Sequence, residues 1–544
     1  MKYFVNYKKQ FSDFVRKYAK IRQRGASMIS DKKWQILFFV TLLIWCFALA
    51  YPINPDYDLF ARLIVGKSVI ENGFILKHDF YSYAPTHLWL DHEWGASAII
   101  YWVSTLSEFF NKSILTTLSA FKSLLVFGIF AIATICVNVR NSKYSSFNIL
   151  YFALAVFASN IVFASTVRCH MFSFLLFALF VLILELYRLH GKKWLLAILP
   201  FLMLLWGNIH GGCLSGLGLI LIYAVGEFLN KKNPIPYLIT LIVSSIVLFV
   251  NPYGFEYVKF LFTAGTMSRE WISEWASPFA TTFYAFKFKI YFIFMILIAL
   301  LKGVENKFDL KNVDMTKLLL LVSTGYLAVM HTKLLPFFVI SSAIFMFDDV
   351  LSILNKIRSL SLLANDKNKY VYAVILFISL SALNSANIHN NTISVNQKYL
   401  PYNAVEFLAT NSVKGNILVD MTYGSYVGYK LYPNNKIFMD GRYEEVYFPD
   451  LLLEMKDFFR MNGNNFDKIL TKYPTDIVLL QKNHTENLTK YLVQKNWREI
   501  FSDENFIVLI RPDYPKIATK TATFDPKTIF DTEISAEMLK NFKE

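Results

Sequence analysis

Two acidic clusters follow directly after the first long apolar run of the chain. The first is a pair of aspartates, and the second, about thirty residues later, places an aspartate, a histidine and a glutamate between two tryptophans. A charge this close to lipid costs free energy unless it has a function or a partner. A carboxylate at such a position can take a proton from an attacking hydroxyl group. The catalytic candidates are Asp58, Asp56, Glu93 and His92, and Asp91 is assigned to acceptor binding or support.

Cationic side chains recur in later loops that the charge pattern places on the same side of the membrane. Arginine and lysine are common partners of phosphate, and a cation stabilises the charge that a leaving phosphate gains. The candidates for binding a lipid phosphate are Arg168, His170, His331, Lys333 and Arg269. His210, Tyr423, Asp440 and Arg442 are further candidates for the acceptor site or for its support.

A divalent metal ion, Mg²⁺ or Mn²⁺, would be bound by Asp58, His92 and Glu93 if it bridged carboxylates to phosphate. The spacing of these residues does not require one. Each candidate also has a purely structural interpretation. Asp56 and Asp58 could cap the helix that follows them, residues 91–93 could anchor the chain at the membrane surface, and Arg168 and Lys333 could reach lipid headgroups without taking part in chemistry.

The composition of the chain indicates the class of protein that holds these residues in place. Of the 544 residues, 55% are hydrophobic, and the mean hydropathy is +0.38, which indicates a polytopic helical membrane protein rather than a soluble one. The net charge is +15, but residues 1–33 alone hold ten Lys and Arg against two Asp, whereas residues 390–544 are nearly neutral. The basic excess therefore indicates membrane topology and not nucleic-acid binding. The four cysteines form neither a disulfide framework nor a metal motif.

Eleven apolar runs predict about eleven transmembrane helices. They lie near 34–52, 114–138, 147–166, 171–188, 194–210, 213–229, 235–251, 290–304, 315–331, 334–348 and 370–386. Lysines and arginines cluster in alternate loops, which places the N-terminus in the cytoplasm and residues after 388 outside. The run 194–229 is too long for one helix, so it is expected to turn back near Gly211 and Gly212.

The predicted domains are a basic amphipathic arm over 1–33, a transmembrane domain over 34–388 with its first outer loop at 53–113, an extracytoplasmic α/β domain over 389–512, and a polar, loose tail over 513–544. Within the α/β domain, strands are expected at 417–420, 436–440, 476–480 and 506–510. Helices are expected at 402–411, 449–461, 465–473 and 486–495.

The motifs resemble those of a large, largely uncharacterised group of bacterial multi-spanning proteins that is similar to the GT-C superfamily of membrane glycosyltransferases. The resemblance covers most of the chain. It rests on the segments 58–66, Gly73, 79–82, 89–94, 168–173, 206–212, 251–254, 268–278, 331–336, 423–426 and 438–442. Three positions depart from the group's pattern, with Arg62 in place of histidine, Cys169 in place of proline and Lys333 in place of arginine.

This resemblance implies an inverting transferase with a catalytic acidic residue in the first outer loop, which corresponds to Asp58 here. It implies a polyprenyl-phosphate-linked sugar as donor and a lipid, glycan or protein of the cell envelope as acceptor. The expected location is the inner (plasma) membrane. The competing interpretation is a transporter or scaffold for envelope glycan or lipid assembly. Few charges lie inside the spans and no internal repeat is visible, which disfavours a transporter.

Overall fold

The computed structural model describes residues 36, 38–51, 54–141, 146–163, 167–267, 269, 272–280, 285–309, 313–356, 398–517 and 520–543. The chain divides into two compact units. One comprises residues up to 50 together with 126–161 and 276–387, and the other comprises 51–125, 162–275 and 388–544. The predicted arm 1–33 and the predicted span 370–386 lie outside the described residues.

The first unit is helical. It contains the helix Phe38–Ala50, the second half of α4 (Ile114–Asn141), α5 (Ser146–Ser159), α11 (Phe286–Glu305), α12 (Met315–Met330), α13 (Leu335–Phe345) and α14 (Phe347–Lys356). Every residue of α13 is buried, and Tyr151 on α5 donates a hydrogen bond of 2.9 Å to the carbonyl of Ser342 on α13. An apolar helix buried on all sides belongs to the centre of a helical bundle.

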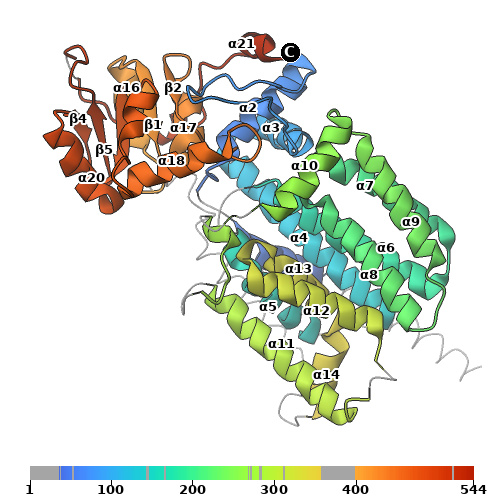
Figure 1. Ribbon diagram of the computed structural model, residues 1–544. Coiled ribbons are helices and arrows are strands. Elements are labelled where there is room, and N and C mark those ends of the chain that lie inside the picture. The colour runs from blue at the N-terminus through green and yellow to red at the C-terminus, as the bar shows by residue number, and fades with distance from the viewer. Residues whose placement is uncertain are drawn as a thin grey trace, which may run out of the picture. The chain divides into compact units, whose positions relative to one another are not determined.

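The helical part of the second unit begins with two helices of the first outer loop, α2 (Leu59–Lys67) and α3 (Trp94–Phe109), which pack against each other (Figure 1). It continues with α6 (His170–His190), α7 (Lys193–Ile209), α8 (Leu214–Leu229), α9 (Ile235–Ile246) and α10 (Gly254–Thr266). The expected reversal near Gly211 is confirmed, because α7 ends at Ile209 and a short 3₁₀ turn over Gly211–Cys213 leads into α8.

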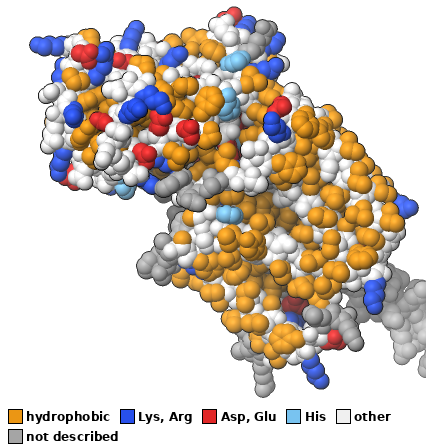
Figure 2. All heavy atoms as spheres, viewed as in Figure 1, with side chains coloured by type: hydrophobic (Ala, Val, Ile, Leu, Met, Phe, Trp, Pro, Cys, Tyr) orange, Lys and Arg blue, Asp and Glu red, His pale blue; other side chains and the backbone are white. Residues whose placement is uncertain are grey.

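The helices identify the chain as a membrane protein. Among the described residues, three helices are long and apolar enough to cross a membrane, and the number rises to five if each of two bent helix pairs is one span. One bent pair joins Ile235–Phe249 to Gly254–Thr266 at 113°. Figure 2 shows hydrophobic side chains over much of the surface of the helices. Eleven spans and their orientation remain predictions.

The α/β region of the second unit has one five-stranded sheet. Its strands are β1 (Gly415–Val419), β2 (Asn435–Ile437), β3 (Ile477–Gln481), β4 (Arg498–Ser502) and β5 (Phe506–Ile510), in the order β2-β1-β3-β5-β4. β1 runs parallel to β2 and β3, whereas β5 runs antiparallel to β3 and β4. The helices are α16 (Tyr402–Thr410), α17 (Met421–Leu431), α18 (Pro449–Arg460), α19 (Lys468–Lys472) and α20 (Lys482–Gln494). All four predicted strands exist, and β4 and α17 are additional.

The expectation of a loose C-terminal tail is wrong for its described residues. Ile529, Ile534 and Leu539 are buried, and the segment holds the short helix α21 (Ala536–Leu539). Asn72 donates a hydrogen bond of 2.8 Å to the carbonyl of Ala536. These three apolar side chains, spaced five residues apart, give a mostly polar segment enough buried surface to remain packed.

Candidate functional site

Asp58 lies just before α2, at the position where an aspartate usually caps a helix. Its side chain makes no capping hydrogen bond. Instead, Oδ2 lies 2.8 Å from Nη2 of Arg168. Asp56 is buried, accepts a 3.1 Å hydrogen bond from the backbone N–H of Asp58, and lies 3.2 Å from Nε of Arg168. Glu274 pairs with Nη1 of the same guanidinium, so three carboxylates surround Arg168.

The electrostatics of this group leave Asp58 ready to exchange a proton near neutral pH. The pKa of Asp58 is raised to about 6, and the largest cause is burial, which disfavours the charged form. The positive charge of Arg168 lowers this pKa, whereas the negative charges of Asp56 and Glu274 raise it further. About a third of the Asp58 side chain remains exposed (36%). A carboxylate that is reachable, oriented and ionised at pH 7 can act as a general base.

Arg62 on α2 organises a second, buried cluster. Its Nη1 lies 2.8 Å from Asp91, its Nε lies 3.3 Å from Glu93, and its Nη2 donates to both carboxylate oxygens of Glu445 at 3.1 Å. Glu445 also accepts a 2.9 Å hydrogen bond from the indole of Trp89. A guanidinium with five donors can satisfy this many acceptors at once, which a histidine at position 62 could not do.

His92 and Glu445 form the charged edge of this cluster. Nδ1 of His92 lies 3.0 Å from Glu445. Burial lowers the pKa of His92, but the contact with Glu445 and its charge outweigh that effect and raise the pKa to about 9. For Glu445, burial raises the pKa, but the positive charges of Arg62 and His92 have the larger combined effect and lower the pKa to about 2. His92 therefore carries a positive charge at neutral pH.

One group of potential metal ligands exists among the described residues. Ligand atoms of His92, Glu93 and His210 all lie within 4.8 Å of one another. Asp58, which the sequence predicts as a candidate metal ligand, is not one of them. Glu93 lies 3.2 Å from Nε2 of His210.

The hydrogen bonds of His210 test whether a metal fits this group. Nδ1 of His210 accepts a 2.8 Å hydrogen bond from the backbone N–H of Gly212. An imidazole whose Nδ1 accepts a hydrogen bond is neutral and carries its proton on Nε2, the atom that faces Glu93. A histidine that binds metal through Nε2 normally donates from Nδ1. These three residues therefore fit a hydrogen-bonded network that holds protons better than they fit a metal ion.

The loop that follows β2 contacts both the Asp58 cluster and the Arg62 cluster. Gly441 lies against Asp58 so closely that an added Cβ would stand 2.0 Å from Oδ1. Glu444 pairs with Arg269, whose guanidinium lies 4.5 Å above the ring of Trp275. Glu445 then joins Arg62. Residues 440–445 therefore connect the α/β region to the first outer loop within one compact unit.

Asp440 and Arg442 fix the shape of this loop and do not face the Asp58 cluster. Arg442 is buried between the rings of Tyr81 and Trp89, at 4.3 and 4.4 Å, and it pairs with Asp440 at 2.9 Å and Asp79 at 2.7 Å. A buried guanidinium flanked by rings and paired with two carboxylates is a rigid support.

The remaining predicted residues lie in three places. His170 is the first residue of α6, with its ring 5.4 Å from that of Phe174. Tyr423 on α17 packs edge-on against Tyr57, the residue between the two aspartates, at 6.1 Å. His331 and Lys333, between α12 and α13, belong to the other compact unit, and their role stays a prediction.

Sequence reasoning missed Glu445, Glu274 and Gly441 as members of the site. Glu445 had a signal, because two glutamates stand directly after the Asp440-Gly441-Arg442 motif. A pair of carboxylates there needs cationic partners when it is buried.

The fold is of the kind seen in oligosaccharyltransferases, which belong to the GT-C superfamily. The chain is similar to archaeal oligosaccharyltransferase AglB from Archaeoglobus fulgidus in complex with an inhibitory peptide and a dolichol-phosphate, with a TM-score of 0.54 and 11% identity over 86% of this chain and 72% of that chain. It is also similar to the oligosaccharyltransferase of the same organism tethered with an acceptor peptide containing the NVT sequon, with a TM-score of 0.52 and 11% identity over 91% of this chain and 75% of that chain.

At this identity the likeness establishes the fold, and the GT-C-like fold predicted from the sequence motifs is confirmed. No protein-family model matches the chain, and no curated protein matches it in sequence.

Proposed function

We propose that the chain is a membrane glycosyltransferase that moves a sugar from a polyprenyl-phosphate-linked donor to an acceptor at the outer face of the plasma membrane. The observation that carries the proposal is the partly exposed carboxylate of Asp58, held 2.8 Å from Arg168 in a fold of the oligosaccharyltransferase kind. The dolichol-phosphate and the acceptor peptide in the similar structures support a lipid-linked donor and a site for a second substrate.

In the proposed reaction, the Asp58 carboxylate takes the proton of the acceptor's attacking group. The acceptor atom forms a bond to the anomeric carbon while the bond from that carbon to the phosphate oxygen breaks, and the lipid phosphate leaves with the electron pair. A single displacement of this kind inverts the configuration at the anomeric carbon. Asp56 and Glu274 hold Arg168, and Arg168 holds Asp58.

The contacts of the predicted phosphate-binding cations change the role that we propose for two of them. Arg168 is surrounded by three carboxylates and Arg269 is paired with Glu444, so we assign both chiefly to positioning. His170, His331 and Lys333 remain the proposed phosphate-binding residues. Glu93 and His92 support the site through the Arg62 cluster, and Tyr423 packs behind Tyr57.

The test compares the masses of envelope lipids and glycans from cells with the wild-type chain and cells with Asp58→Asn at matched expression. Loss of a fixed hexose, pentose or amino-sugar mass from one species is expected, and the mass difference gives the sugar class. Asp513→Asn is the matched control, because the Asp513 side chain is 72% exposed and lies outside both clusters. If Asp58→Asn restores the wild-type profile to a deletion strain, Asp58 is not the base, and a transporter or scaffold replaces the enzyme.

A further inference from the structure

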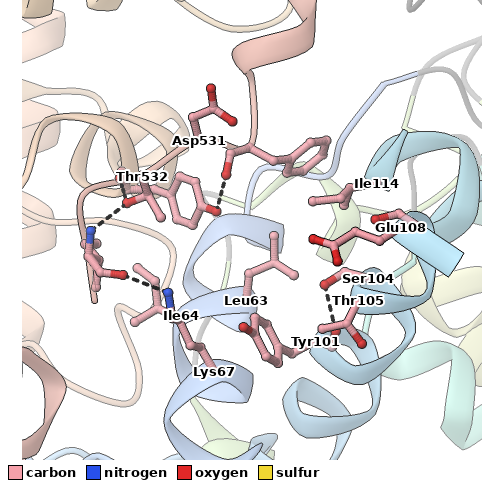
Figure 3. Close-up of a pocket in the computed structure, with 14 residues that line it drawn as sticks. Leu63, Ile64, Lys67, Tyr101, Ser104, Thr105, Glu108, Ile114, Asp531 and Thr532 are labelled. Atoms are coloured by element: carbon pink, nitrogen blue, oxygen red, sulfur yellow. Dashed lines mark hydrogen bonds between the residues drawn. The ribbon is translucent and has the colours of Figure 1, made fainter. Parts of the chain in front are cut away.

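A cavity of about 440 Å³ lies in the second unit, between α2, α3 and the C-terminal segment (Figure 3). This volume falls within the range of about 300–1,000 Å³ that small-molecule sites occupy. No residue of the Asp58 or Arg62 clusters lines the cavity. It therefore is a feature separate from the site described above.

Hydrogen bonds hold the C-terminal wall of the cavity in place. Lys67 on α2 donates a 3.0 Å hydrogen bond to the carbonyl of Ile534. Tyr429 on α17 donates a 2.7 Å hydrogen bond to the carbonyl of Phe530, and Thr532 donates a 2.6 Å hydrogen bond to the carbonyl of Tyr429. Because side chains from two helices fix this segment, a ligand would not have to order it on binding.

The lining combines apolar surface with unpaired acceptors. Leu63 and Phe530 contribute apolar faces, and Ser104 and Thr532 contribute hydroxyl groups. The carboxylates of two further lining residues, Glu108 and Asp531, take part in no hydrogen bond or ion pair with other described residues. In Figure 3 the side chain of Glu108 extends toward Leu63, so that a carboxylate and an apolar face border the same space.

We propose that this cavity binds a sugar unit that is neutral or carries an amino group. The hydroxyl groups of a sugar are hydrogen-bond donors that match two free carboxylates, and its apolar ring face matches Leu63 and Phe530. A phosphorylated or acidic sugar is disfavoured, because its charge would face Glu108 and Asp531 while Lys67 is engaged with Ile534. The proposal concerns binding alone and does not depend on the transfer reaction proposed above.

The test uses the full chain in lipid nanodiscs, because maltoside detergents would present sugars of their own. Saturation-transfer NMR and titration are performed with N,N′-diacetylchitobiose and cellobiose as neutral probes and glucose 6-phosphate as an anionic probe. Binding of at least one neutral probe at millimolar concentration is expected, with no binding of glucose 6-phosphate. Glu108→Gln and Asp531→Asn should each weaken it about tenfold, since each removes a hydrogen bond to a charged acceptor.

Two controls separate this site from the catalytic proposal. Glu537→Gln alters an exposed side chain on the same C-terminal segment and should leave binding unchanged, and Asp58→Asn should bind the neutral probe as the wild type does. Because Glu108 and Asp531 are exposed, their substitution should not unfold the chain, which the unfolding temperature checks. The proposal is overturned if neither neutral probe binds, or if glucose 6-phosphate binds as well as they do. It is also overturned if both cavity variants bind the neutral probe as the wild type does.

Discussion

Arg62 and Glu445 are separated by 383 residues in the chain, yet both oxygens of the Glu445 carboxylate accept hydrogen bonds from one nitrogen of the Arg62 guanidinium at 3.1 Å. Both side chains are buried, with 6% and 3% of their side-chain surface exposed. The pair joins the first outer loop to the loop after β2 within one compact unit. Two buried charges of opposite sign depend on each other, since neither has water to solvate it.

Glu445→Ala should therefore destabilise the chain strongly. It leaves the buried charges of Arg62 and His92 without their carboxylate, and breaking a buried pair from one side typically costs about 3–5 kcal/mol. Thermal unfolding in nanodiscs measures the effect. Glu537→Ala, which removes an exposed ion pair with Lys540, should leave the unfolding temperature unchanged. Equal unfolding temperatures for wild type and Glu445→Ala would show that the pair does not hold the unit together.

The same pair makes the free energy of unfolding depend on pH in the acid range. The folded-state pKa of Glu445 lies at about 2, below its ordinary value of 4.5. Its stabilising contribution is therefore complete above the unfolded pKa, near 4.5, and is lost as the pH falls toward 2. In denaturant titrations, the wild type should lose more stability between pH 5 and pH 3 than Glu445→Gln does. Parallel curves for the two proteins would contradict this assignment.

The sequence predicted the membrane class, four of the five strands and several of the charged residues that the structure brings together. It missed α17, because Gly424, Gly428 and three tyrosines are weak helix formers. Those glycines serve packing instead. An added Cβ at Gly424 would stand 2.3 Å from the carbonyl oxygen of Met439, and one at Gly428 would stand 2.8 Å from the ring of Tyr81. Tertiary contacts therefore override local propensity in this helix.

The pairing of the site residues could not be predicted from the sequence, for a similar reason. Asp58, Arg168 and Glu274 come from three separate loops, and which cation meets which carboxylate depends on the packing of the helices between them. Nothing in the pattern of charges favours Arg168 as the partner of Asp58 over Arg168 as a ligand of phosphate. The pattern identifies the charged residues, but it does not predict which of them pair.

The rate of sugar transfer should rise with pH through the pKa of Asp58. That pKa is raised to about 6, chiefly by burial, and the proposed base works only when ionised, so the rate should increase about tenfold between pH 5 and pH 7. Arg168→Met removes the cation that favours the ionised form, and the midpoint should then move above 6. Arg168→Lys keeps the charge and should shift the midpoint less. A flat profile in the wild type, or the same midpoint in Arg168→Met, would exclude Asp58 as the titrating base.

Chelation should leave the protein unchanged. The ligand atoms of Glu93 and His210 are engaged with each other at 3.2 Å, and the Gly212 N–H donates to the other nitrogen of His210. We therefore expect the unfolding temperature and the transfer rate to be the same before and after dialysis against EDTA. Elemental analysis should find less than one equivalent of zinc, manganese or magnesium per chain. A stoichiometric metal whose removal lowers both quantities would show that His92, Glu93 and His210 form a metal site after all.

Gly441→Ala should lower activity while leaving the fold intact. The new Cβ would lie 2.0 Å from Oδ1 of Asp58, so the carboxylate must turn away from it and lose its alignment with Arg168. A displacement of about 1 Å at a catalytic group can cost about 100-fold in rate. The unfolding temperature should change little, because the clash meets a partly exposed side chain rather than backbone. Gly265→Ala is the matched control, since an added Cβ there meets nothing within 4 Å. If Gly441→Ala transfers sugar at the wild-type rate, the position of Asp58 does not set the rate, and the base must be sought elsewhere in the first outer loop.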